Sequence, residues 1–179
     1  YRVHHYRPRT EGLFARIERW SEVGRPANSF WRTISRDNVT TWYGRDAGSR
    51  IFDPAEPRRI FQWLVCQITD DNGNGSIYRF QADIGLGVDA EATWESNRLS
   101  QGNPQAPHAN RYLKRILYGN VQPYLPKLGA SLEDPLPQTW MFEAVFDYGD
   151  HSGDFPTPMS DKTTPANPWP ARMDAFSDH

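Results

Sequence analysis

The chain has 179 residues and a mass of 20.6 kDa, the size of one domain with a core of its own. Its net charge of −2 and pI near 6.2 give no electrostatic reason to expect nucleic acid or an anionic membrane as a partner. No apolar stretch approaches the ~20 residues that a membrane-spanning helix needs, so direct membrane insertion is not expected.

The residue types favour strands and turns over long helices. Seven Trp, nine Phe and eight Tyr supply large side chains that suit a pleated sheet, although the mean hydropathy is only −0.76. Thirteen Gly and fifteen Pro imply many turns. The composition therefore predicts a mainly β protein.

The N-terminal half predicts strands joined by short turns. Residues 13–20 alternate as a strand does, with Arg16, Glu18 and Trp20 on the same side. Residues 21–29 predict a turn. Residues 30–34 and 39–43 then predict a hairpin with a four-residue connection. Two dipeptides that end in proline, Asp53-Pro54 and Glu56-Pro57, argue against a helix in residues 45–58.

The middle of the chain predicts a second hairpin. Residues 59–69 form the most apolar segment, residues 70–75 carry Asn-Gly turn chemistry, and residues 76–82 alternate again. Cys66 lies in the apolar segment and is the single cysteine, so no internal disulfide can form. We interpret it as a small buried hydrophobic residue.

Two aromatic-rich segments predict the centre of the sheet. Residues 110–120 interleave basic and apolar side chains and end in Gly-Asn, and residues 140–149 are a second aromatic-rich segment that ends in Tyr-Gly. In the second segment, one alternation carries five apolar or aromatic residues and should be buried, namely Trp140, Phe142, Ala144, Phe146 and Tyr148.

The remaining segments predict little regular structure. Residues 88–99 predict one short helix, and residues 101–108 and 122–138 predict loops. Residues 150–179 contain five prolines and predict an extended tail. The chain begins at Tyr1 and ends at His179 with no closing element, so we expect it to be part of a longer protein. The fold class is thus mainly β, a set of antiparallel hairpins with one short helix and a Pro-rich C-terminal tail.

The best metal-like motif is better explained as a turn. Asp70, Asn72, Asn74 and Gly75 match the first half of a calcium-binding loop. The twelfth position, however, is Gln81, which cannot supply the bidentate carboxylate, and the flanking segments predict strands. A hairpin turn accounts for the same residues.

The other candidate motifs are also weak. Residues 85–90 match a dinucleotide-binding pattern, but no second strand or acidic residue follows at the required distance. The adjacent His4 and His5 point to opposite faces of a strand, and Asp147, Asp150 and His151 lack a fourth metal ligand. No Glu-x-Glu pair occurs. We therefore assign no catalytic, cofactor-binding or metal-binding residue and expect no cofactor.

Several long stretches resemble the SpvB-type region of the B component of bacterial toxin complexes (Tc toxins). They run in order along almost the whole chain, so residues 1–179 are interpreted as one partial SpvB-type domain with the tail at 150–179. The matching stretches are residues 30–44, 49–51, 53–54, 59–64, 110–116, 118–120, 124–126, 142–149 and 168–170.

The resemblance implies a structural role. In Tc toxins the B component joins the C component, an RHS-repeat protein, to form a hollow β-rich shell around the cytotoxic part of C. A propeller of B docks on the pore-forming A component. The resemblance thus implies a secreted, non-catalytic shell segment whose partners are C, the rest of B and, indirectly, A. In the salmonella protein that names the domain, the ADP-ribosyltransferase is a separate domain, and nothing here matches it.

Two alternatives remain open. A Trp-rich carbohydrate- or surface-binding module would expose several Trp rings in one row, whereas a shell segment would bury most of them. Five of the seven, Trp20, Trp31, Trp42, Trp63 and Trp140, fall in predicted strands. A toxin effector enzyme domain would instead show a pocket lined by acidic or His side chains with shifted pKa values.

Overall fold

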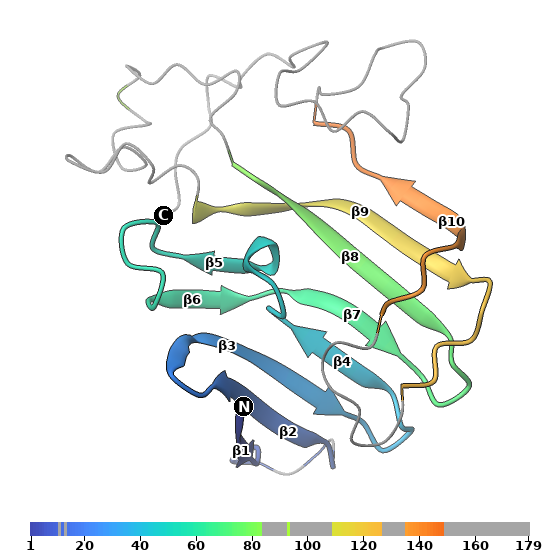
Figure 1. Cartoon of the computed structure of the whole chain (residues 1–179), viewed down its shortest axis with the longest axis horizontal. Coiled ribbons are helices and arrows are strands. Elements are labelled where there is room, and N and C mark those ends of the chain that lie inside the picture. Colours follow the sequence, from blue (N-terminus) through green and yellow to red (C-terminus); the bar gives the residue numbers. More distant parts are fainter. Residues whose placement is uncertain (11, 13, 84–92, 94–108, 127–134, 149–179) are drawn as a thin grey trace.

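The computed structural model describes residues 1–10, 12, 14–83, 93, 109–126 and 135–148, and in these residues the chain is built of antiparallel strands (Figure 1). The strands are β1 (Arg2–Tyr6), β2 (Arg16–Glu22), β3 (Arg25–Ile34), β4 (Thr40–Tyr43), β5 (Arg50–Phe52), β6 (Ile60–Trp63), β7 (Val65–Thr69), β8 (Gly75–Ala82), β9 (Arg111–Asn120) and β10 (Trp140–Val145). One 3-10 turn, η1 (Ala47–Ser49), precedes β5. The mainly β fold class is confirmed.

Eight of the described strands form one open sheet. Its order is β1-β2-β3-β4-β7-β8-β9-β10, and each neighbouring pair is antiparallel. Strands β5 and β6 form a separate two-stranded sheet. The order follows the chain closely because short turns join most neighbours.

Both predicted hairpins are present. Strands β3 and β4 pair across a turn in which Asn38 takes a left-handed conformation with φ of 57°. Strands β7 and β8 pair across the turn that begins at Asp70. The side chain of Asn120 ties this second turn to β9, because its Nδ2 donates to the carbonyl of Gly73 at 2.8 Å and its Oδ1 accepts from the amide of Gly75 at 2.7 Å.

The sequence predicts one strand over residues 59–69, but the structure has two. The segment divides at Leu64 into β6, which pairs with β5, and β7, which pairs with β4. The amide of Leu64 donates to Ser49 and its carbonyl accepts from Gly44, both at 2.8 Å. Gly44 has φ of 63°, and a Cβ at this position would lie 2.9 Å from Cβ of Trp63. The division is therefore set by contacts distant in sequence.

The sequence predicts that β9 and β10 lie at the centre of the sheet, and this prediction is wrong. They pair with each other, but β10 is the last strand of the described sheet. The predicted burial is also wrong for three of the five residues, since Phe142, Phe146 and Tyr148 are 54%, 40% and 44% exposed. An outer strand has a neighbour on one side only, so fewer groups cover its side chains.

Sequence reasoning missed some strands and misplaced others. Strand β1 lies in the polar N-terminus, where strand alternation is considered only for His4 and His5, and β5 lies in residues 45–58, where the prediction is only that no helix forms. Strand β3 begins at Arg25, inside the predicted turn 21–29, and pairs with β2. The helix predicted at 88–99 and the tail 150–179 lie outside the described residues, apart from Thr93.

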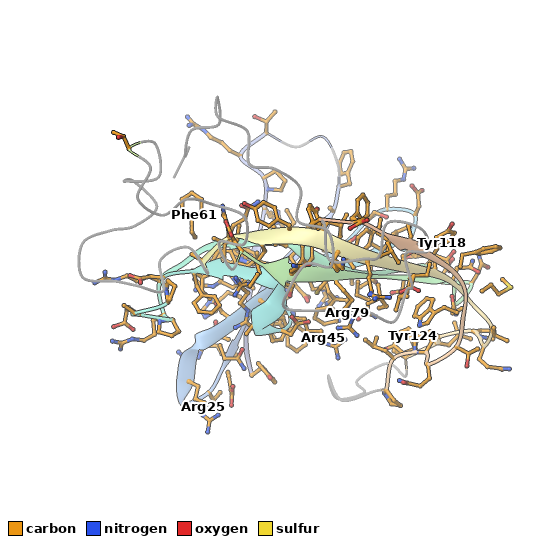
Figure 2. The ribbon with its side chains drawn as sticks, turned by 90° about the horizontal axis from the view of Figure 1, so that it is seen from above. Arg25, Arg45, Phe61, Arg79, Tyr118 and Tyr124 are labelled. Atoms are coloured by element: carbon orange, nitrogen blue, oxygen red, sulfur yellow. The ribbon has the colours of Figure 1, made fainter. Side chains whose placement is uncertain are left out.

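The sheet has two distinct sides, which Figure 2 shows edge-on. Arg45 and Arg79 lie on one side and Tyr118 on the other, and we call these the Arg79 face and the Tyr118 face. Four hydrophobic residues are buried among those described, namely Phe30, Trp42, Cys66 and Ile77. Trp20 packs against the first three. The core is therefore small for a sheet of this width.

Candidate functional site

One row of directly opposed residues crosses all eight strands on the Arg79 face. In an antiparallel sheet such residues have neighbouring side chains, so the row places eight side chains next to one another across the sheet. In strand order it contains His5, Glu18, Arg32, Trp42, Gln67, Ile77, Leu117 and Glu143. We call it the cross-strand row.

Glu18 is the centre of the charged end of this row. Its side chain is fully buried. One oxygen, Oε2, accepts from Nε of Arg32 at 2.8 Å and from the indole of Trp20 at 3.0 Å. The other, Oε1, pairs with Arg16 and lies 3.7 Å from Nδ1 of His5. Groups from β1, β2 and β3 thus meet at one carboxylate.

The pKa of Glu18 shows how the carboxylate behaves. Burial by itself raises this pKa, but the hydrogen bonds from Trp20 and Arg32 and the charges of Arg32 and Arg16 outweigh it and hold the pKa below its ordinary value. The group therefore stays ionised at neutral pH. A general acid would need the opposite shift, so the geometry fits a fixed structural anion.

Arginine and aromatic side chains continue the row toward the middle of the sheet. The guanidinium of Arg32 lies 4.8 Å from the ring centre of Trp20 and 5.2 Å from that of Trp42. Arg45 stacks on Trp42 at 5.3 Å and donates to Oε1 of Gln67 at 2.8 Å. Cations stacked on rings and bonded to acceptors stabilise a sheet from one strand to the next.

The far end of the sheet shows exposed aromatic side chains. On the Tyr118 face, Tyr118 stacks on Phe142 with ring centres 5.2 Å apart, and both are about half exposed. Tyr112 and Tyr148 form a second pair at 5.8 Å. Met141 of β10 is also exposed. Alternation places Met141 on the face opposite Phe142, so the exposed aromatic surface of the Tyr118 face here is the pair Tyr118 and Phe142. Exposed rings of this kind are typical of surfaces that contact another part of a protein or a partner.

The calcium-like motif forms a hairpin turn. Oδ1 of Asp70 accepts from the backbone amides of Asn72 and Asn74 at 3.0 and 2.8 Å, and Oδ2 accepts from the side chain of Asn74 at 2.7 Å. These bonds lower the pKa of Asp70, and the bond from the side chain of Asn74 has the largest effect. The turn thus uses both side-chain oxygens of Asp70, the first ligand of the calcium-like motif. Among the described residues, no group of three His, Cys, Asp or Glu side chains could hold a metal ion.

The remaining candidates show no reactive arrangement within the described part of the chain. The thiol of Cys66 is buried and donates to the carbonyl of Trp42 at 3.4 Å, and burial raises its pKa. His4 and His5 point to opposite faces, as predicted. Residues 85–90 and the pair Asp150 and His151 lie outside the described residues. Of the helices that the structure describes, none has the length and apolarity that a membrane crossing requires.

A family model described as the Salmonella virulence plasmid 65kDa B protein, SpvB, matches residues 1–179. The chain belongs to the SpvB family. The mono(ADP-ribosyl)transferase SpvB of Salmonella typhimurium is 33% identical over 178 residues, which is 99% of this chain and 28% of that protein. The chain thus spans less than a third of the curated relatives that it matches.

Solved structures of SpvB-family and Tc toxin proteins have the same fold. The N-terminal domain of the effector SpvB from Salmonella typhimurium matches with a TM-score of 0.71 and 30% identity, over 95% of this chain and 49% of that one. The TcdB2-TccC3 complex matches with a TM-score of 0.68 and 30% identity, over 95% of this chain and 8% of that one. The Photorhabdus luminescens Tc holotoxin pore matches with a TM-score of 0.66 and 30% identity, over 93% of this chain and 7% of that one. The chain is therefore a Tc toxin-related SpvB domain.

Sequence reasoning did not find the cross-strand row, although it placed Arg16, Glu18 and Trp20 on one side of a strand. The missing information was the register between strands, which decides that Glu18 faces Arg32 and His5. The alternation of charged and aromatic residues in residues 13–20 was the available signal. It could not show that the carboxylate is fully buried.

Proposed function

We propose that the chain is a non-catalytic wall segment of the B component of a secreted bacterial toxin complex. In this role it forms part of the β-rich shell that encloses the cytotoxic region of the C component. The cross-strand row is the observation that carries the proposal, because it uses the buried charged groups of the N-terminal strands to hold neighbouring strands together. The match to complexes of B and C type supports the choice of partner.

The small core is a second support. The described sheet buries four hydrophobic residues, while thirteen large hydrophobic residues in the same part of the chain are exposed. A sheet of this kind leaves apolar surface for further layers of a larger assembly to cover. In a wall segment, the rest of B and the C component would cover this apolar surface.

A catalytic role has support only in the name of the relatives, mono(ADP-ribosyl)transferase SpvB. This chain covers 28% of those proteins, and the matching solved structure is described as an N-terminal domain. Among the described residues, the buried carboxylate of Glu18 is paired with two arginines, that of Asp83 accepts from the hydroxyl of Tyr112 at 3.1 Å, and the thiol of Cys66 has a raised pKa, so none of these groups is prepared for chemistry. The effector-enzyme alternative thus has no supporting site among the residues that the structure describes.

The carbohydrate-binding alternative predicts a row of exposed Trp rings. Of the five Trp residues in described strands, Trp42 is buried and the other four are partly buried. The exposed rings belong to Tyr and Phe side chains, and some of these pair with each other. This distribution favours the wall segment.

The test is to co-express the parent B component with its C component and to isolate C by affinity. We expect B to co-purify and the cytotoxic region of C to resist added protease. The variant Glu18→Lys places a cation beside Arg16 and Arg32, so it should open the wall and remove this protection. Glu56→Lys is the matched control, since Glu56 forms a surface ion pair with Arg58 outside the cross-strand row. Protection that survives Glu18→Lys, or NAD cleavage by the isolated 179-residue chain, would contradict the proposal.

A further inference from the structure

A basic cleft opens beside β1 on the Tyr118 face, away from the cross-strand row. It has a volume of about 470 Å³ and is lined chiefly by Arg2, His4, Tyr6, Arg19, Ser21 and Glu22. The proposed wall function does not use these residues. The cleft therefore raises a separate question about what it binds.

The strand register brings the cationic groups of the cleft together. Arg2, His4 and Tyr6 alternate along β1, so their side chains leave the same face. The register then places Ser21 opposite Arg2 and Arg19 opposite His4 on β2. Two guanidinium groups and an imidazole thus line one short stretch of the sheet surface.

Neighbouring rings hold part of this site in place. Tyr6 packs on Trp31 with ring centres 4.9 Å apart. The guanidinium of Arg19 lies 5.8 Å from the ring centre of Trp63, and its Nη2 donates to Ser29 at 3.4 Å. Such stacking leaves the remaining donors of an arginine available for an oxygen ligand.

The charges of the cleft are unbalanced. Glu22 is the one carboxylate among the cleft residues, and its Oε2 accepts from Asn28 at 2.6 Å. Within the described residues, neither Arg2 nor Arg19 forms an ion pair, and the buried Nε of Arg19 has no hydrogen-bond acceptor. A buried donor without an acceptor is costly, so an anionic oxygen at this position would be stabilised.

The strand β1 has a second unused feature, its outer edge. It is the first strand of the described sheet, and in that part of the chain no strand pairs with its outer side. An extended peptide can pair with such an edge through backbone hydrogen bonds, and its alternate side chains then lie over the face of the sheet. On the Tyr118 face, those side chains would meet Arg2 and His4.

We propose that β1 and the basic cleft form a docking site for an extended acidic peptide segment of a partner chain. The partner backbone pairs with the edge of β1, and a Glu or Asp side chain of the partner enters the cleft between Arg2 and Arg19. The unbalanced charge selects an acidic partner, and the two cationic residues of the opposed strands fix its register.

The probe is a labelled peptide, acetyl-Ser-Glu-Val-Glu-Val-Glu-Ser-amide, whose binding to the 179-residue chain is followed by fluorescence anisotropy. We expect saturable binding that weakens as salt is added. Arg2→Gln should reduce the affinity about tenfold, because it removes a charge-assisted hydrogen bond from an exposed side chain. Arg36→Gln is the matched control, since Arg36 is also exposed but lies in the β3–β4 turn.

Two further probes keep the proposal open to refutation. The same peptide with Lys in place of Glu, or with N-methyl groups that block backbone pairing, should bind at least tenfold more weakly. Inorganic phosphate alone should compete poorly. Equal loss of binding in Arg2→Gln and Arg36→Gln, unchanged binding of the methylated peptide, or strong binding of phosphate without binding of the acidic peptide would overturn the proposal. Circular dichroism of each variant verifies that the fold is unchanged.

Discussion

Glu18 has a buried, ionised side chain that three strands share. Arg32 and Trp20 bond to one of its oxygens, and Arg16 pairs with the other. A buried ion pair adds little when it replaces a hydrophobic pair, but the removal of one partner is costly because the other charge remains without compensation. Substitutions at this residue should therefore affect stability more than substitutions of surface carboxylates.

The variant Glu18→Gln should lower the free energy of unfolding by about 3 kcal/mol. It leaves Arg32, whose side chain is only 22% exposed, beside a neutral amide. Urea unfolding followed by tryptophan fluorescence measures the change. Glu56→Gln, in an exposed ion pair with Arg58, is the control and should behave as the unaltered chain does. Equal stability of the two variants would contradict the structural role of Glu18.

The lowered pKa of Glu18 also predicts a pH dependence. A carboxyl group with a lower pKa in the folded chain than in the unfolded chain contributes stability that is fully present above the unfolded value of about 4.3. This contribution is lost as the pH falls through the lower folded value. Glu18→Gln should therefore lose less stability than the unaltered chain between neutral and acidic pH, as urea unfolding at a series of pH values would show.

At the scale of the elements, β6 and β7 are separated by contacts at Leu64, and Gly44 permits the close approach of Trp63. The indole of Trp63 donates to the carbonyl of Ser29 at 2.7 Å and packs edge-on against Trp31. Trp63 thus helps to attach the two-stranded sheet of β5 and β6 to the main sheet, together with the buried side chain of Arg50, which donates to the carbonyl of Gly44 and to Asn28. The space for that ring depends on a residue without a side chain.

Gly44→Ala should lower the free energy of unfolding by about 2 to 4 kcal/mol. The added methyl group would collide with Trp63, and a φ of 63° is unfavourable for alanine. Chemical unfolding and the near-ultraviolet circular dichroism of the tryptophans measure the effect. Gly12→Ala is the matched control, because a Cβ at Gly12 meets no atom within 4 Å. A small and equal change in both variants would show that Trp63 has room to move.

At the scale of the whole molecule, the described sheet has one well-packed end and one exposed end. The strands β2, β3 and β4 supply two of the four core residues, Phe30 and Trp42, and their packing partner Trp20, together with the charged part of the cross-strand row. The strands β9 and β10 carry the exposed aromatic pair Tyr118 and Phe142 on the Tyr118 face. The exposed end is the part of the sheet that gains most from further layers in a larger assembly.

The 179-residue chain should therefore bind a hydrophobic dye such as anilinonaphthalene sulfonate, whose fluorescence reports exposed apolar surface. Phe142→Ser should reduce this fluorescence severalfold, because it removes one ring of the stacked pair with Tyr118. Val23→Ser is the control, since Val23 is an exposed apolar residue of the β2–β3 turn that is not part of an aromatic pair. Equal dye binding by both variants would show that the aromatic pair does not form an apolar patch.

The sequence by itself determined the local properties of this protein. Alternation and turn residues predicted the hairpins at β3–β4 and β7–β8 and the strand β9, because these depend on neighbours in the chain. The buried state of Cys66 and the turn at Asp70 were predicted for the same reason. The resemblance to the SpvB-type region was also present in the sequence and is confirmed by the family match.

Only the tertiary structure decided how the strands are ordered and which side chains they share. Strand β10 looked central from its aromatic pattern, but the order of the sheet places it last among the described strands. The register between strands joins Glu18 to Arg32 and places Arg2 beside Arg19, and no local pattern specifies that register. The reason is physical, because burial and pairing arise from contacts between segments that are distant in the chain.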